Sequence, residues 1–332
     1  MSTSPILQDP QLLVRNEEST DDRYGCSPGL RPIPLLLQYG LLLIDKPAGP
    51  TSHEVVAWVR RILGVDKAGH SGTLDPSVTG VLPTGLGEAT KVLFILLFGT
   101  KEYQAIARLH ESVNENQLKT VLDEFTAQIY QRPPQRSAVR RQTRTRTIYE
   151  LEMLEKRGNL LILRVACEAG TYVRKLIYDI GEALGPGATM AELRRTRVSG
   201  FNESGRITEL HELVSAIAAW KEDKSEEKLR NAIMPVEEAT KSLPPVFIRD
   251  SAVDSICHGA QLAIPGVLKL SSTINKGDVV AVYTQKGEIV SIAESEMASQ
   301  EIAEETRGIA FSTKRVIMRV GTYPKMWKHN IS

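Results

Sequence analysis

HSGTLDP, from His70 to Pro76, is the most informative segment of this sequence. Gly72 allows the backbone to approach a ligand closely, and Pro76 fixes φ at about −65°. A loop of this composition can hold one carboxylate, that of Asp75, rigidly beside the imidazole of His70. The segment by itself is also compatible with an ordinary turn capped by Asp75. The rest of the sequence is therefore needed to distinguish a functional site from an ordinary turn.

The length and composition are those of a soluble globular protein. The chain has 332 residues, of which 42% are hydrophobic and 24% charged, and this length is enough for two domains at about 100 to 200 residues per domain. The net charge is only +1, so composition alone does not indicate a nucleic-acid partner.

The distribution of charge is more specific than the total. Between Phe125 and Tyr149 the sequence holds six arginines and no acidic residue. A basic stripe of this kind attracts phosphate even when the whole molecule is neutral, although a solvated arginine-rich loop remains an alternative. The six are Arg132, Arg136, Arg140, Arg141, Arg144 and Arg146.

Cysteine usage fits a reducing compartment, and hydropathy fits a protein without a membrane span. Cys26, Cys167 and Cys257 lie far apart, without the spacing of a disulfide framework or a zinc site. The N-terminus lacks a signal-peptide pattern, and the longest apolar run, Val92 to Phe98, is shorter than the roughly 18 residues of a membrane span. We therefore expect a soluble, cytoplasmic protein with no membrane partner.

Periodicity predicts an alternation of strands and helices. Thr51 and Glu54 form a capping-box pattern before an apolar stripe, and Gly64 is placed to end that helix. Asn114 is suited to cap another helix. Strands are expected at 41–46, 103–109, 148–155 and 160–168, and helices at 51–64, within 88–98, after Asn114, and at 171–184.

A change of composition divides the chain. Around 221–245 the sequence becomes highly charged and then reads SLPPV. Short β-like runs separated by glycines follow and predict a small β-barrel. We expect an N-terminal extension with little regular structure over 1–34, a main domain over 35–243 and a C-terminal domain over 244–328. The β-like runs are 261–264, 279–284, 288–293 and 315–320.

Several segments together resemble one family. The chain resembles the TruB-type pseudouridine synthases, and more closely the dyskerin-like catalytic subunit of archaeal H/ACA ribonucleoproteins. The resemblance implies an α+β fold, with a mixed, largely antiparallel sheet flanked by helices in the catalytic domain and a C-terminal RNA-binding PUA barrel. The matching segments are KPAGPTSH (46–53), HSGTLDPSVTGVLP (70–83), GLGEATK (85–91), KEY (101–103), QRPPQRSAVRR (131–141), CEAGTYVRKLIYDIG (167–181) and LRRTRVSGF (193–201).

The chemistry of this family suits a loop carboxylate. Conversion of uridine to pseudouridine breaks a C–N glycosidic bond, rotates the base and forms a C–C bond, with no net redox change. A carboxylate can assist by attacking carbon or by stabilising a cationic sugar, and neither a metal nor an organic cofactor is needed. The resemblance therefore implies that Asp75 is the essential nucleophile or base.

Two further residues complete the catalytic set that the resemblance implies. Arg174 corresponds to the arginine that pairs with the catalytic aspartate. As a surface arginine it would stand at a helix start, where the helix dipole disfavours positive charge, which favours a specific carboxylate partner. Tyr103 corresponds to the tyrosine that stacks on the target base, although it could also be a half-buried strand tyrosine.

The target uridine must leave its helix to be reached, at a cost of a few kcal/mol. The resemblance assigns three residues to this bound nucleotide. His70 would contact the flipped nucleotide or fill its gap, Leu193 would line the base pocket, and Lys46 would support the catalytic loop. Two of them have a plainer alternative: His70 could be structural, and a leucine is more often core than pocket.

The way in which the target is chosen is a separate question. Only about 45 residues separate Tyr103 from the strand at Ile148, too few for the long inserted loop of stand-alone tRNA enzymes, and this resembles the guided subfamily. There the PUA domain anchors the ACA end of an H/ACA guide RNA, and His258, Gly259 and Ala260 are the expected contact, with a plain strand and turn as the alternative. Eukaryotic dyskerins have lysine-rich tails that this chain lacks, which favours an archaeal source.

In the guided subfamily the guide RNA selects the uridine in a substrate RNA, which is rRNA and in some cases tRNA. The protein partners that the resemblance implies are a small scaffold protein, a glycine/arginine-type accessory protein and a kink-turn-binding protein. Two competing hypotheses remain. The protein could be a stand-alone tRNA pseudouridine synthase that acts on the T-arm uridine, or a non-enzymatic RNA scaffold that keeps the fold.

Overall fold

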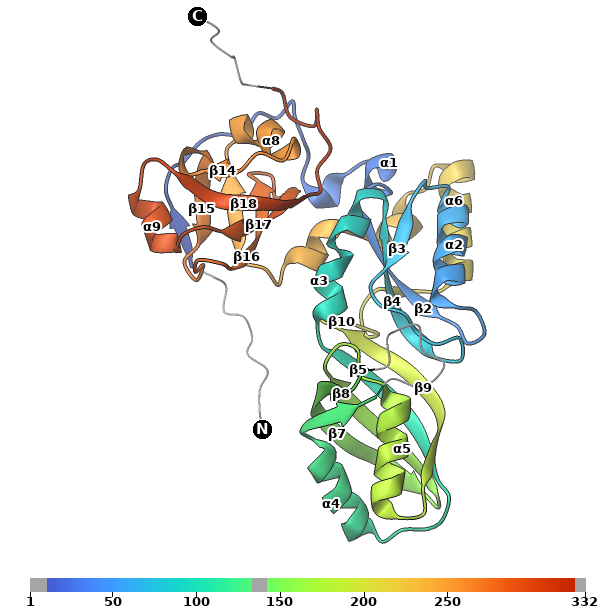
Figure 1. Cartoon of the computed structure of the whole chain (residues 1–332). Coiled ribbons are helices and arrows are strands. Elements are labelled where there is room, and N and C mark those ends of the chain that lie inside the picture. Colours follow the sequence, from blue (N-terminus) through green and yellow to red (C-terminus); the bar gives the residue numbers. More distant parts are fainter. Residues whose placement is uncertain (1–10, 133–141, 326–332) are drawn as a thin grey trace, which may run out of the picture. The chain divides into compact units, whose positions relative to one another are not determined.

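The computed structural model describes residues 11–132 and 142–325 (Figure 1). Three of the six arginines named above, Arg136, Arg140 and Arg141, lie outside the described residues. The chain forms two compact units. We call residues 42–84 and 93–232 the large-sheet unit, and residues 1–41, 85–92 and 233–332 the barrel unit.

The large-sheet unit is built on a mixed sheet with strand order β11-β2-β4-β9-β5-β8-β7-β6. The pairs β5–β8, β5–β9, β7–β8 and β6–β7 are antiparallel, whereas β2–β11 and β4–β9 are parallel. The expected mixed, largely antiparallel sheet is confirmed. The strands are β2 (Gly40–Lys46), β3 (Ala68–His70), β4 (Thr79–Leu86), β5 (Lys101–Leu109), β6 (Gln128–Gln131), β7 (Arg144–Arg157), β8 (Leu160–Cys167), β9 (Ala188–Val198), β10 (Phe201–Asn202) and β11 (Ile207–Thr208).

The helices of this unit begin and end where the sequence provides caps. Thr51 and Glu54 form the expected capping box at the start of α2, and Gly64 ends that helix in the left-handed conformation, with φ of 66°. Asn114 caps α4 through its side-chain oxygen. The helices are α2 (Ser52–Leu63), α3 (Leu93–Phe98), α4 (Glu115–Phe125), α5 (Val173–Leu184), α6 (Leu210–Asp223) and α7 (Glu227–Ala232).

One hydrophobic core in this unit positions the candidate site. Apolar side chains of α4 and α5, such as Leu118 and Leu176, pack against buried residues of β5, β7 and β8, such as Val165. Burial of this kind supplies most of the stability of such an element, because helix propensity alone is weak. Tyr103 and Leu193 lie partly buried against the edge of this core.

The barrel unit is a seven-stranded sheet with order β1-β15-β13-β16-β17-β18-β14. The expectation that 315–320 forms a strand is wrong, because the last strand, β18, runs from Ile309 to Val316 and turns out of the sheet before Val320. The elements are β1 (Leu12–Val14), η1 (Pro28–Leu30), α1 (Ile33–Leu36), η2 (Gly87–Val92), β12 (Ile233–Pro235), η3 (Val236–Thr240), β13 (Pro245–Ile248), α8 (Asp250–Cys257), β14 (Leu262–Ala263), η4 (Ile264–Gly266), β15 (Val267–Ser271), β16 (Val279–Thr284), β17 (Ile289–Ser295), α9 (Ser299–Glu304) and β18.

The N-terminal segment is attached to the barrel. β1 pairs antiparallel with β15 at the edge of the sheet, and the Arg15 guanidinium donates a hydrogen bond of 2.6 Å to the carbonyl oxygen of Ile264. The Arg31 guanidinium forms a buried ion pair with Glu237, at 2.7 Å. These contacts fix a segment that has little secondary structure of its own.

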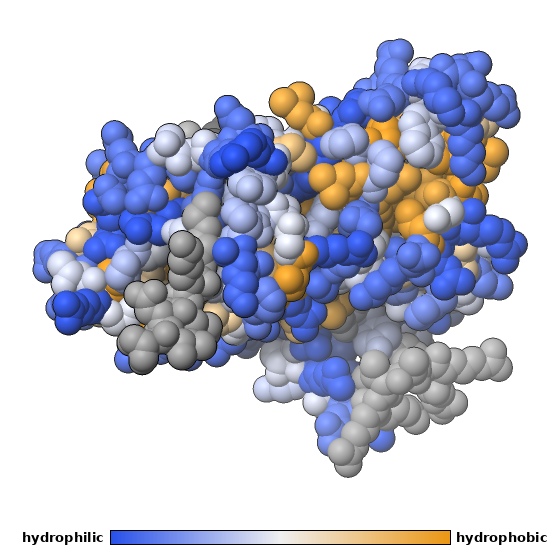
Figure 2. Space-filling view, turned by 90° about the horizontal axis from the view of Figure 1, so that it is seen from above, coloured by the Kyte–Doolittle hydropathy of each residue, from blue (hydrophilic) through white to orange (hydrophobic). Residues whose placement is uncertain are grey.

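A shallow apolar groove runs between α2 and α6. Trp58 and Val214 are exposed to 38% and 50%, and the groove has a volume of about 280 Å³. Hydrophobic surface gathers on the side of the molecule that carries these two helices (Figure 2). Within the described parts of the chain, no helix is both long and apolar enough to cross a membrane. The groove is lined by Trp58, Arg61, Ile62, Leu210, His211 and Val214.

Candidate active site

Asp75 stands in the loop between β3 and β4, and Lys46 holds this loop from beneath. The Lys46 side chain is fully buried, at 0% exposure. Its ammonium donates hydrogen bonds to three main-chain carbonyl oxygens, those of Pro47 at 2.8 Å, Pro76 at 3.0 Å and Val78 at 2.8 Å. Burial lowers the pKa of Lys46, and the charge of Asp75 opposes this shift. Lys46 therefore braces the loop on the C-terminal side of Asp75.

Ser52, the first residue of α2, braces the other side of Asp75. Its hydroxyl donates to the carbonyl oxygen of Leu74 at 3.1 Å and accepts from the backbone N–H of Leu74 at 2.8 Å. The backbone N–H of Gly49 donates to the carbonyl oxygen of Pro76 at 2.9 Å. The residues before and after Asp75 are thus both anchored, and the carboxylate is presented by a fixed backbone.

Arg174 lies against this carboxylate. Its guanidinium forms an ion pair with Asp75, and the two side chains are 50% and 57% exposed. Arg174 is the second residue of α5. Two residues earlier, the backbone of Tyr172 is held by the buried Gln131 side chain. The Gln131 amide oxygen accepts from the Tyr172 N–H at 2.9 Å, and the Gln131 amide nitrogen donates to the Tyr172 carbonyl oxygen at 3.2 Å. The end of β6 thereby sets the position at which α5 begins.

Tyr103 and Arg195 face one another across neighbouring strands. They are register partners on β5 and β9, and Arg195 is only 1% exposed. Burial raises the pKa of Tyr103, and Arg195 opposes this rise through its positive charge. The charge of Asp75 also acts on Tyr103, which places the phenol near the catalytic loop. Leu193 is two residues before Arg195 and packs at the edge of the same core.

His70 forms a pair with His53 at the start of the loop. The two rings meet edge to face, with centroids 4.9 Å apart and an angle of 79° between their planes. Burial, with the charges of His53 and Arg195, lowers the pKa of His70 to about 4. His70 is therefore neutral near pH 7. Its buried Nδ1 has no hydrogen-bond partner among the described residues.

Two cations of this region are buried, namely Arg195 and Lys101. The sequence suggests a phosphate contact or an exposed position for Arg195 and gives no role to Lys101, and the burial of Arg195 shows that an exposed position is wrong. The Lys101 ammonium caps the end of α3, donating to the carbonyl oxygens of Leu96 at 3.0 Å and Gly99 at 2.6 Å. Burial and the charge of Arg195 lower the pKa of Lys101 to about 8. Both residues stand in segments that resemble the family, KEY and LRRTR, but the sequence does not reveal which cation turns inward.

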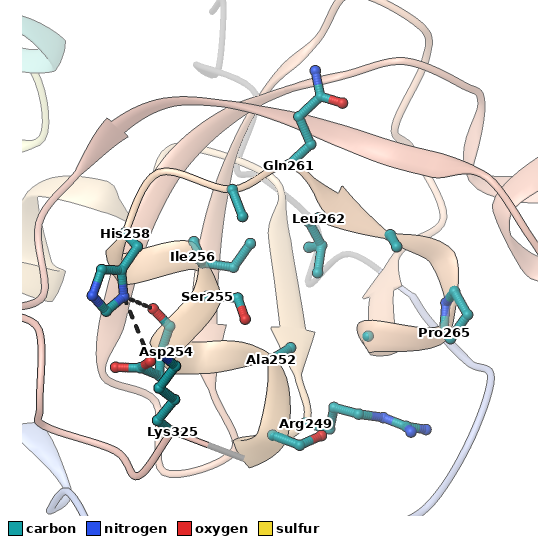
Figure 3. Close-up of a pocket in the computed structure, with 14 residues that line it drawn as sticks. Arg249, Ala252, Asp254, Ser255, Ile256, His258, Gln261, Leu262, Pro265 and Lys325 are labelled. Atoms are coloured by element: carbon teal, nitrogen blue, oxygen red, sulfur yellow. Dashed lines mark hydrogen bonds and ion pairs between the residues drawn. The ribbon is translucent and has the colours of Figure 1, made fainter. Parts of the chain in front are cut away.

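The residues expected to contact guide RNA lie in the barrel unit, at a cavity of about 510 Å³ (Figure 3). His258 and Ala260 line this cavity, whereas Gly259 stands between them outside the lining. The His258 Nδ1 is 2.8 Å from the carbonyl oxygen of Asp254 and 3.5 Å from its carboxylate. The remaining wall is largely apolar, and the charged side chains at it are Arg249, Asp254 and Lys325.

The site residues thus fall into two groups. Asp75, Arg174, Tyr103, His70, Lys46 and Leu193 belong to the large-sheet unit, and His258, Gly259 and Ala260 belong to the barrel unit. Over residues 11–132 and 142–325, no three or more His, Cys, Asp or Glu side chains are grouped so that they could hold a metal ion.

Family models match four successive parts of the chain. The N-terminal domain of TruB family pseudouridylate synthases matches residues 60–173, and the C-terminal domain of tRNA pseudouridylate synthase B matches residues 174–241. A PUA domain matches residues 244–317, and a DKCLD (NUC011) domain matches residues 2–56.

Full-length similarity extends over the same range. A probable tRNA pseudouridine synthase B of Methanopyrus kandleri is 51% identical over 323 residues, which are 97% of this chain and 95% of that protein. The corresponding protein of Pyrococcus abyssi is 49% identical over 96% of this chain and 95% of its own length.

Two solved structures are similar over almost the whole chain. A chain in the crystal structure of a Cbf5-Nop10-Gar1 complex has a TM-score of 0.88 and 49% identity, covering 96% of this chain and 97% of its own. A chain in the structure of an H/ACA RNP bound to a substrate RNA containing 2'-deoxyuridine has a TM-score of 0.89 and 46% identity, covering 98% of this chain and 100% of its own.

Proposed function

The chain belongs to the TruB family of pseudouridine synthases, and from this premise we propose that it converts selected uridines in RNA to pseudouridine as the catalytic subunit of a guide-RNA-directed H/ACA ribonucleoprotein. One observation carries the guided assignment. The similarity to the chain of an H/ACA RNP bound to substrate RNA covers 98% of this chain and 100% of that one. It therefore includes the barrel unit as well as the large-sheet unit.

Asp75 is the carboxylate that acts on the uridine. Its backbone is braced on both sides by Lys46 and Ser52, so little reorganisation is needed when a substrate arrives. Arg174 is the charge partner that orients the carboxylate. Because the pair is about half exposed, a nucleotide that is turned out of its helix can reach it from solvent.

Tyr103 and His70 act as uncharged groups beside this carboxylate. The pKa of Tyr103 lies above its ordinary value, so its phenol stays protonated near pH 7 and offers a flat neutral face to a pyrimidine. The pKa of about 4 for His70 keeps the imidazole neutral as well. His70 is suited to contact the extruded nucleotide through stacking or a neutral hydrogen bond.

The barrel cavity is the proposed anchor for the end of the guide RNA. It combines an apolar wall with His258, Asp254, Arg249 and Lys325, a combination that can hold a base and its phosphate. Resemblance to the guided subfamily assigns the ACA end of the guide to this region. The partner proteins follow from the same resemblance and from the Cbf5-Nop10-Gar1 complex: a small scaffold protein, a glycine/arginine-type protein and a kink-turn-binding protein.

A second candidate function rests on the sequence relatives, which are named as probable tRNA pseudouridine synthases B. In this case the chain modifies the T-arm uridine of tRNA without a guide. Both functions use the same chemistry at Asp75 and differ in how the uridine is selected.

Reconstitution distinguishes the two functions. The full chain is incubated with an unmodified tRNA transcript, and separately with an H/ACA guide RNA, its substrate and partner proteins of the Nop10 and Gar1 type. We expect pseudouridine in the substrate only when the guide is present and complementary. Rapid modification of tRNA by the chain alone would contradict strict guide dependence and would support the second function.

A further inference from the structure

Arg195 is a buried cation at the floor of the candidate site. It lies on β9 with 1% exposure, and β4 approaches it so closely at Gly80 that a Cβ on that glycine would stand 2.2 Å from the Arg195 carbonyl oxygen. Gly80 itself adopts φ of 103°, a backbone conformation that residues with a Cβ atom rarely adopt. The backbone of Arg195 therefore has a fixed position against β4.

The guanidinium joins three separate parts of the site. Its Nε donates to the carbonyl oxygen of Val81 at 2.9 Å, and its Nη2 is 3.3 Å from the carbonyl oxygen of Gly72, three residues before Asp75. Tyr103 is its register partner on β5, so the two side chains lie on the same face of the sheet, and the charge of the guanidinium acts on the phenol. Arg195 thus connects β4, the catalytic loop and the base-stacking strand through one planar group, a geometry that lysine cannot reproduce.

No carboxylate pairs with this guanidinium among the residues that the structure describes. A buried charge without a counter-ion is costly, and an apolar side chain of similar volume would fill the same space at a lower cost in free energy. The retention of a cation here therefore points to a role in the site beyond packing.

We propose that Arg195 is a positioning residue for pseudouridine formation, which orients the Tyr103 hydroxyl relative to the loop that carries Asp75. This inference rests on the proposed function only because it names pseudouridine formation as the reaction. A guanidinium donates hydrogen bonds and accepts none, so in a hydrogen bond between the two side chains the Tyr103 oxygen is the acceptor. The single proton of the phenol then remains available to point toward a bound nucleotide.

The groups that act on Tyr103 are few. Asp75 and Cys167 raise the pKa of its phenol, and Arg195 is the cation that lowers it. Removal of the guanidinium therefore predicts a measurable rise in the pKa of Tyr103. An arginine whose charge did not reach the phenol would leave this titration unchanged, and Arg195→Lys separates the charge from the geometry of the guanidinium.

The test uses the full chain with fluorotyrosine incorporated, and the ¹⁹F resonance of Tyr103 is assigned by its loss in Tyr103→Phe. We expect Arg195→Met to raise the pKa of Tyr103 and to lower the single-turnover rate of the complete guided complex by about 10²-fold, the cost of a misplaced group. Substrate RNA affinity is expected to change by no more than a few fold. Arg195→Lys is expected to restore most of the titration but only part of the rate.

Arg164→Met is the matched control, because Arg164 lies on β8, which pairs with β5 on the side away from β9, and forms an ion pair instead with Glu152 at 2.7 Å. It should leave both the titration and the rate near the wild-type values. An Arg195→Met protein with a normal Tyr103 titration would overturn the proposal, even if its rate fell. If Arg195→Met does not fold, Arg195→Lys is the deciding variant. A wild-type reaction rate in Arg195→Lys would overturn the proposal. A wild-type titration of Tyr103 with a reduced rate would support it. The titration requires no RNA, so its result stands independently of the guided assignment.

Discussion

The guanidinium of Arg174 contacts the carboxylate of Asp75 while both side chains remain about half exposed to solvent. An ion pair this exposed contributes little to stability, in the range of about 0–1 kcal/mol. Its value to the protein therefore lies in the orientation of the carboxylate.

Replacement of Arg174 separates these two effects. We expect Arg174→Met to lower the single-turnover rate of pseudouridine formation by about 10²-fold, because the carboxylate loses its orienting partner. The midpoint of thermal unfolding should stay close to that of the wild type. Tritium release from [5-³H]uridine-labelled substrate measures the rate, and a variant with a normal rate would exclude an orienting role for Arg174.

Replacement of Asp75 removes the reacting group itself. Asp75→Asn keeps the shape of the side chain and is expected to reduce the rate by about 10⁴-fold or more, with RNA affinity within a few fold of the wild type. Asp45→Asn, on the neighbouring strand β2, serves as a control in the same tritium-release assay. Retained activity in Asp75→Asn would remove Asp75 from the mechanism.

Replacement of Lys46 tests the brace beneath the loop. Lys46→Met leaves three carbonyl oxygens without their donor, of which that of Val78 is in a buried hydrogen bond, and we expect the free energy of unfolding to fall by about 1–3 kcal/mol. Lys119→Met, at an exposed position of α4, should change it by less than about 0.5 kcal/mol. Equal denaturation curves for the two variants in urea would show that Lys46 does not stabilise the loop.

His70 predicts a specific dependence of stability on pH. Its pKa is lowered from 6.5 to about 4 in the folded protein, so between these values the unfolded chain binds a proton that the folded chain does not. Stability therefore rises with pH across this window and is lost as the pH falls from 6.5 to 4.

The comparison between variants isolates the histidine from the carboxylates that titrate nearby. His70→Gln should lose less stability than the wild type over the same interval, as measured by urea denaturation at each pH. His211→Gln, which alters an exposed histidine, should follow the wild-type curve. Parallel curves for all three proteins would disprove burial of a neutral imidazole at position 70.

The barrel cavity offers a test of guide anchoring that leaves the core intact. Ala260 is exposed at the cavity, so Ala260→Trp adds bulk there without disturbing buried side chains. We expect the affinity for an H/ACA guide RNA to fall by at least about tenfold, and that for a guide lacking the ACA end to change little. Lys276→Trp, outside the cavity lining, is the size control. Unchanged guide binding by Ala260→Trp in a filter-binding assay would place the anchor elsewhere.

Much of the local structure could be predicted because caps and periodicity are short-range signals. The capping box at Thr51 and the cap at Asn114 were both confirmed, and the resemblance to TruB-type enzymes was confirmed by the full-length relatives. These signals depend on residues within a few positions of one another, which the sequence displays directly.

Strands β4 and β9 were not predicted, and the reason is physical. β4 is buried along almost its whole length and contains Pro83 and two glycines, so it shows neither alternation nor the usual strand composition. β9 carries four polar or charged residues in succession, from Arg194 to Arg197. The inward turn of Arg195 depends on register with β5 and β4, which only the assembled sheet establishes.

The braces of the catalytic loop also differ from Arg174 in their distance along the chain. Lys46 and Ser52 reach loop residues that lie 22 to 32 positions away, whereas Arg174 is 99 positions from Asp75. Since the entropy lost on closing a loop grows with its length, the contacts of Lys46 and Ser52 with the catalytic loop cost less entropy to form than the ion pair between Arg174 and Asp75. We therefore expect the folding chain to fix the shape of the loop before α5 docks and before the ion pair between Arg174 and Asp75 forms.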